Sequence, residues 1–88
     1  MNIEVLKFSA TWCGPCKVLA TTLKDAAEVK NIDVEQDQET ARKYNIRSVP
    51  TLVFLRDGEE VHRVSGSMPL DKYEAIITEI NDSKELNN

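Results

Sequence analysis

The chain has 88 residues, which is enough for one domain with a small core, because a domain of this size buries only about 60 to 65% of the surface that its unfolded chain exposes. Its net charge of −4 argues against nucleic acid or an anionic membrane as a partner, since both require clustered lysine and arginine. No stretch is long and apolar enough to span a membrane, and the first ten residues lack the features of a signal peptide. We expect a monomeric protein, and the two closely spaced cysteines considered below favour the cytoplasm.

The first half of the chain predicts a strand–helix–strand–helix unit. Residues 3–8 form an apolar run typical of a buried strand, and apolar residues then recur at helical spacing from about residue 13 onward. Residues 29–34 predict a second strand. Asp37 is a candidate N-cap for a short helix over residues 38–44.

The second half predicts a hairpin and a final helix. Residues 51–55 form the clearest strand, and Asp57-Gly58 is a strong two-residue turn signal that leads into a strand over residues 60–64. Pro69 then lies near the start of a helix whose apolar residues repeat at helical spacing as far as Ile80.

This order of elements, βαβαββα, places the chain in the α/β class. We expect residues 1–82 to form the domain and the polar residues 83–88 to form a frayed tail.

Both cysteines lie in the segment Trp12-Cys13-Gly14-Pro15-Cys16-Lys17, one helical turn apart. Gly14 has no side chain, and Pro15 has a fixed φ that suits a first helical turn. At the helix cap, Cys13 would be favoured as a thiolate, which is the attacking species. Cys16, one turn inside, should be less exposed and react second. A disulfide here closes a loop too short to stabilise the fold, so the pair indicates catalysis in a reducing compartment.

Two alternatives compete with a reactive dithiol. The cysteines could be ordinary buried residues, but a Gly-Pro dipeptide between them would serve no purpose in the interior of an ordinary helix. They could also bind a metal, but a closed site needs about four protein ligands, and the chain offers only the distant His62 besides them. A metal would have to lie between two chains, so we expect no metal and a surface role for His62.

Further motifs follow the cysteines along the chain: Ser48-Val49-Pro50-Thr51, then Asp57-Gly58, then Ser65-Gly66. In this order, and over nearly the whole length, the sequence resembles the thioredoxin family. The resemblance implies a minimal thioredoxin fold, with a four-stranded mixed sheet flanked by helices and with Pro50 cis beside the cysteines.

The resemblance also implies the chemistry. Cys13 would attack a protein disulfide and Cys16 would resolve the mixed disulfide, by thiol–disulfide exchange. The protein would bind no cofactor, and its electrons would come from NADPH through a reductase of the thioredoxin-reductase type. A glutaredoxin-like protein that uses glutathione is an alternative suggested by the small size. A subunit that docks a larger enzyme, with an idle dithiol, is another.

By the same resemblance, a client segment would lie over Trp12, pair its backbone with Val49 before Pro50, and touch Ser65 and Gly66. Trp12 could instead belong to the core.

The chain departs from the family most at Lys7, which occupies the place of a buried aspartate behind the cysteines, while Asn31 falls near the place of its partner lysine. An ammonium near the sulfurs would lower their pKa values by favouring thiolates. Alternatively, Lys7 reaches solvent or pairs with Asp33 or Glu35, and leaves the thiols nearly untouched.

Overall fold

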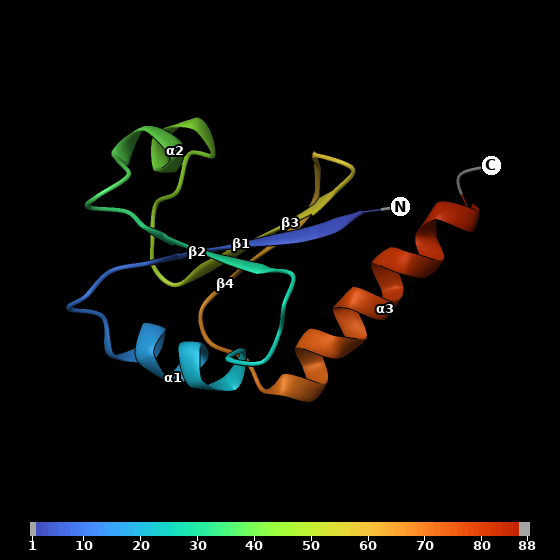
Figure 1. Cartoon of the computed structure of the whole chain (residues 1–88), viewed down its shortest axis with the longest axis horizontal. Helices are drawn as coiled ribbons and strands as arrows, with labels where there is room; N and C mark the ends of the chain where they lie inside the picture. The colour runs from blue at the N-terminus through green and yellow to red at the C-terminus, as the bar shows by residue number, and fades with distance from the viewer. Residues whose placement is uncertain (1, 87–88) are drawn as a thin grey trace.

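The elements of the computed structural model, which describes residues 2–86, follow the predicted order (Figure 1). They are β1 (Ile3–Ser9), α1 (Gly14–Thr22), β2 (Val29–Asp33), α2 (Gln38–Lys43), β3 (Thr51–Arg56), β4 (Glu59–Ser65) and α3 (Leu70–Leu86).

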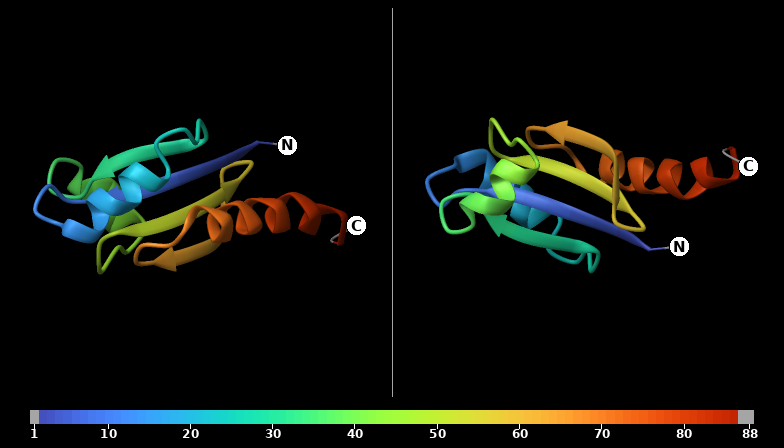
Figure 2. Two further views of the ribbon diagram at one scale, coloured as in Figure 1. Left: turned by 90° about the horizontal axis from the view of Figure 1, so that it is seen from below. Right: turned by 90° about the horizontal axis from the view of Figure 1, so that it is seen from above.

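The four strands form one mixed sheet in the order β2-β1-β3-β4. Strand β1 is parallel to β2 and antiparallel to β3, and β3 is antiparallel to β4. Helices α1 and α3 lie on one face of the sheet and α2 lies on the other (Figures 1 and 2). The predicted α/β class and the mixed sheet flanked by helices are therefore confirmed.

Side chains of the two central strands alternate between two cores, because successive residues of a strand point to opposite faces. Val5 packs with residues of α1 and α3, whereas its neighbour Leu6 packs on the α2 side. The buried residues of the first core are Val5, Leu19, Leu23, Leu52, Phe54, Met68, Tyr73 and Ile80. Those of the second are Leu6, Phe8, Ile32, Val53 and Leu55.

Local signals set the ends of several elements. Asp37 caps α2, since its carboxylate accepts hydrogen bonds from the Thr40 backbone N–H at 3.2 Å and from the Thr40 hydroxyl at 2.8 Å. These bonds hold the pKa of Asp37 below its ordinary value. Asp57 and Gly58 both have positive φ, at 53° and 87°, as a tight turn between β3 and β4 requires.

Helix α3 extends further than predicted. The sequence indicates a frayed tail from residue 83, but the helix continues to Leu86, because residues 84–86 are good helix formers and no glycine or proline ends it. Residues 87–88 of the predicted tail lie outside the described residues. None of the described helices is long and apolar enough to cross a membrane.

A partly buried hydrogen bond ties α3 to the loop before β2. Tyr73 is 2% exposed, and its hydroxyl donates to Oε2 of Glu28 at 2.6 Å. Burial, followed by this contact with the carboxylate, raises the pKa of Tyr73 well above its ordinary value.

We predict that Tyr73→Phe lowers the free energy of unfolding by about 1 to 2 kcal/mol at pH 7, because it removes a hydrogen bond to a charged group. In the parent, the folded state holds the phenol proton more tightly than the unfolded chain. Stability should therefore fall as pH rises above the ordinary tyrosine value of about 10, and Tyr73→Phe should weaken that fall. Urea unfolding between pH 7 and 11 measures both effects.

Tyr44→Phe is the matched control. The Tyr44 ring packs on Phe8 with centroids 5.9 Å apart, and among the described residues its hydroxyl makes no hydrogen bond. Equal losses of stability in the two variants would contradict the role given to the Tyr73–Glu28 bond.

Candidate active site

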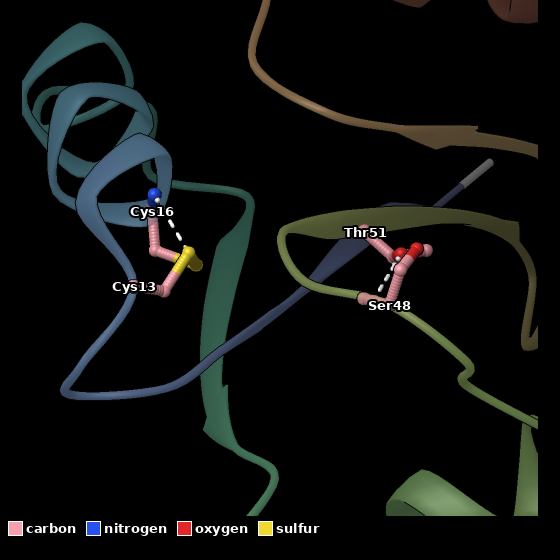
Figure 3. The surroundings of a disulfide bond; sticks show 4 residues. All are labelled: Cys13, Cys16, Ser48 and Thr51. Atoms are coloured by element: carbon pink, nitrogen blue, oxygen red, sulfur yellow. Dashed lines mark hydrogen bonds between the residues drawn. A yellow bond between two sulfur atoms is a disulfide. The ribbon is translucent and has the colours of Figure 1, made fainter.

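The end of β1 delivers both cysteines to the start of α1. Cys13 is the N-cap residue, with its own N–H donating to the carbonyl of Ala10 at 3.2 Å, and Gly14 and Pro15 form the exposed first residues of the helix. Cys13 and Cys16 are joined as a disulfide with their Cα atoms 5.3 Å apart. Sγ of Cys13 also accepts a hydrogen bond from the N–H of Cys16 at 3.1 Å (Figure 3). The first sulfur therefore takes the place of the usual capping oxygen.

The two cysteines are buried to the same extent. Cys13 is 4% exposed and Cys16 is 3% exposed, and both pack with Ala10 and against Val34 and Val49. The expected difference in exposure is therefore absent in the disulfide form, in which both cysteines pack in one buried cluster at the start of α1. The capping position, not exposure, distinguishes the two sulfurs.

The loop before β3 lies beside the disulfide. Val49 contacts the cysteine cluster, and the peptide bond between Val49 and Pro50 is cis, as the resemblance implies. The hydroxyl of Thr51 donates to the Ser48 carbonyl at 2.8 Å and so closes the loop around the proline (Figure 3).

The loop after β4 is tied to the same proline. The Gly66 N–H donates to the Pro50 carbonyl at 2.8 Å, and Gly66 has a φ of 93°, which a glycine adopts without strain. The hydroxyls of Ser65 and Thr51 lie 3.5 Å apart. The structure thus brings Ser65 and Gly66 next to Pro50, although 14 residues or more separate them from Thr51 and Pro50 along the chain.

Trp12 is a surface residue and not part of the core. Its side chain is 68% exposed, and its indole N–H donates to Oε2 of Glu35 at 3.2 Å. The ring forms one wall of a hollow of about 180 Å³ beside the disulfide. The lining residues of this hollow are Trp12, Val34, Ile46, Arg47, Ser48 and Val49.

Sequence reasoning did not find several of these residues. It considered Glu35 only as a partner for Lys7, and it did not single out Val34, Ile46 or Arg47. They come from two loops, after β2 and before β3, and only the sheet places both loops next to Trp12.

Lys7 lies in β1 and is 6% exposed. Burial lowers its pKa from the ordinary lysine value. Neither acid considered as its partner forms an ion pair with it: Asp33 accepts the N–H groups of Glu35 and Gln36 at 2.8 and 3.3 Å, and the Glu35 carboxylate accepts from Trp12.

Within the part of the chain that the structure describes, no three His, Cys, Asp or Glu side chains are grouped so that they could hold a metal ion. His62 is exposed on β4, and its ring lies against Phe54 with the centroids 5.6 Å apart.

Comparison with known proteins agrees with this geometry. Residues 2–79 match the Thioredoxin family. Thioredoxins of Staphylococcus epidermidis and Staphylococcus aureus are 35% and 34% identical to this chain, and each match covers 86% of the chain and 80% of the relative.

Solved structures give the same result. Fasciola hepatica thioredoxin is 38% identical with a TM-score of 0.81, over 89% of this chain and 80% of that one. The reduced thioredoxin pre-protein of Schistosoma mansoni is 40% identical with a TM-score of 0.80, over 89% of this chain and 78% of that one. The chain therefore belongs to the thioredoxin family and is a thiol–disulfide oxidoreductase with a redox-active disulfide between Cys13 and Cys16.

Proposed function

We propose that the protein reduces disulfides of client proteins, with Cys13 as the nucleophile and Cys16 as the resolving thiol. The observation that carries the proposal is the capping position of Cys13, whose sulfur faces the backbone N–H of Cys16 at the start of α1. A thiolate at this position would keep the hydrogen bond and gain from the helix dipole. Cys16 lies one turn further into the helix, where that stabilisation is weaker.

The exchange balances without a further reagent. The Cys13 thiolate attacks one sulfur of the client disulfide, forms a mixed disulfide and expels a client thiolate. The Cys16 thiolate then attacks Sγ of Cys13, releases the second client thiolate and closes the internal disulfide. Two electrons pass from the dithiol to the client, and the two protons that Cys13 and Cys16 lose on ionising end, through water, on the client thiols.

Client docking is supported by the surface around the disulfide. Among the described residues, no hydrogen bond engages the backbone of Val49, so an extended client segment can pair with it. Pro50 has no N–H to compete for that segment. The apolar hollow beside Trp12 offers room for a client side chain, and Ser65 and Gly66 border the other side of Pro50.

The oxidised protein must be recharged before it can act again. We propose that NADPH supplies the electrons through a thioredoxin-reductase-type donor and that no cofactor binds to this chain itself. This direction requires a reducing compartment, for which we propose the cytoplasm.

We predict that Cys16→Ser traps a client on Cys13 as a stable mixed disulfide, because no thiol remains to resolve it. Cys13→Ser should neither trap nor reduce the client in a single-turnover assay with the pre-reduced protein. Gel electrophoresis without reductant measures the adduct. Adduct formation by Cys13→Ser instead would reverse the two roles, and full client function in a Cys13→Ser, Cys16→Ser double variant would favour the docking subunit.

The electron donor can be identified separately. We expect NADPH with a thioredoxin reductase to regenerate the dithiol at least tenfold faster than glutathione with glutathione reductase, as measured by NADPH oxidation in the presence of a protein disulfide. Faster recharging by glutathione would favour the glutaredoxin-like alternative.

Trp12→Ala should lower kcat/KM for a protein disulfide by about tenfold, which corresponds to about 1.4 kcal/mol, because it removes one wall of the hollow. Reduction of a small disulfide such as hydroxyethyl disulfide should change little, since it does not fill that surface. Val18→Ala is the control, because Val18 is also apolar and 59% exposed on α1 but does not line the hollow. Equal losses for both substrates would show that Trp12 acts on the thiols and not on docking.

A further inference from the structure

Lys7 is the one charged side chain that is buried among the described residues. A buried ammonium loses much of its hydration, and proteins ordinarily compensate for this with a paired acid. The mechanism proposed above does not use this residue, so its burial needs an explanation of its own.

The strand register places Lys7 under the helix that carries the dithiol. Lys7 lies on the same face of β1 as Val5, and its neighbours across the sheet are Leu52 and Asn31. Helix α1 runs back over this face, as Figure 1 shows, and its Leu19 is buried in the same core as Val5. The cysteines pack with Ala10, the residue that follows the end of the same strand.

Spacing along the strand locates the side chain further. At about 3.3 Å per residue, Lys7 lies about 7 Å from Val5 and about 7 Å from Ser9, the last residue of β1 before Ala10. Val5 and Leu19 share one buried core, and Ala10 and Cys16 share the next cluster, so the register points to a place for Lys7 under the turn of α1 between Cys16 and Leu19. A lysine stem spans about one helical turn of 5.4 Å, so an amine at this place can come near the sulfurs.

No described acid neutralises this amine. On the same face of β2, Asp33 is engaged by two backbone N–H groups. On α1, the nearest charged side chain is Lys17, which is exposed. Toward the other end of the face, Glu28 accepts from Tyr73 of α3.

The amine also keeps contact with water. Among the described residues, every fully buried side-chain nitrogen or oxygen has a hydrogen-bond partner, and Lys7 has none, so Nζ must reach solvent. It can therefore exchange its proton while its stem remains buried.

We propose that Lys7 stabilises the thiolate that forms when the Cys13–Cys16 disulfide is reduced, and so makes this dithiol more oxidising than the same site without the lysine. Reduction takes two electrons and leaves one thiolate and one thiol, with one proton taken up and Lys7 charged. The inference rests on the proposed assignment of Cys13 and Cys16 as the reacting thiols.

The proposed role of Lys7 implies a reciprocal effect, because a thiolate that is stabilised by an ammonium stabilises that ammonium equally. Burial lowers the pKa of Lys7 in the disulfide form, and reduction should raise it again.

Lys7→Met tests the inference, since methionine keeps an unbranched stem without the charge. Equilibrium with a series of glutathione redox ratios, and thiolate absorbance against pH, are measured for the parent and the variant. We expect the equilibrium constant to shift about tenfold toward a more reducing protein, equivalent to about 30 mV, with a raised pKa of Cys13. Lys7→Arg should restore values close to those of the parent.

Lys24→Met is the matched control, because Lys24 is exposed after the end of α1 and its replacement changes the net charge by the same amount. An unchanged equilibrium and thiolate pKa in a cooperatively folded Lys7→Met variant would overturn the inference, and so would an equal shift in Lys24→Met.

A measurement on the parent covers the case in which Lys7→Met does not fold. The ¹³Cε resonance of Lys7, titrated in the oxidised and reduced forms, should give a higher pKa in the reduced form, and equal values would overturn the inference. No client protein takes part in either measurement, so a failure to reduce clients would count against the proposed function and not against this role of Lys7.

Discussion

The position of β1 in the middle of the sheet is the constraint on which the site depends. This strand pairs with β2 on one side and with β3 on the other, so its end cannot shift without breaking two ladders. The chain leaves it at Ala10, turns within three residues and enters α1 at Gly14. The N-terminus of the helix, and the sulfur that caps it, are therefore held by a strand that is paired on both sides.

The same strand distributes its side chains between two unlike environments. Val5 and Lys7 face the two helices, whereas Leu6 and Phe8 face α2. An apolar residue at position 7 would simply extend the first core. A lysine there buries its stem in that core, while its amine reaches water and has no described acid to balance it. The effect proposed for Lys7 would link the chemistry of the disulfide to the packing of the sheet.

Much of the fold could be predicted from local patterns. The strand predicted over residues 51–55 is β3, Thr51–Arg56, and the turn predicted at Asp57-Gly58 has the positive φ values that this turn needs. Asp37 caps the helix that it was expected to cap. Such signals depend on residues within a few positions of each other, so tertiary contacts seldom override them. The end of α3 was less predictable, because a polar tail of good helix formers has no residue that stops it.

The sequence by itself determined the reaction class, because two cysteines one turn apart at a helix start can exchange disulfides whatever surrounds them. It also indicated the order of the elements. Only the tertiary structure decided that Glu35 binds the indole of Trp12, that Gly66 bonds to Pro50, and that Lys7 is buried without an acid. Each of these depends on which segments lie side by side in the sheet. The contact between Trp12 and Glu35, for example, joins residues that are 23 positions apart in the sequence. Local propensity carries no information about such separations, whereas strand pairing and its register fix them.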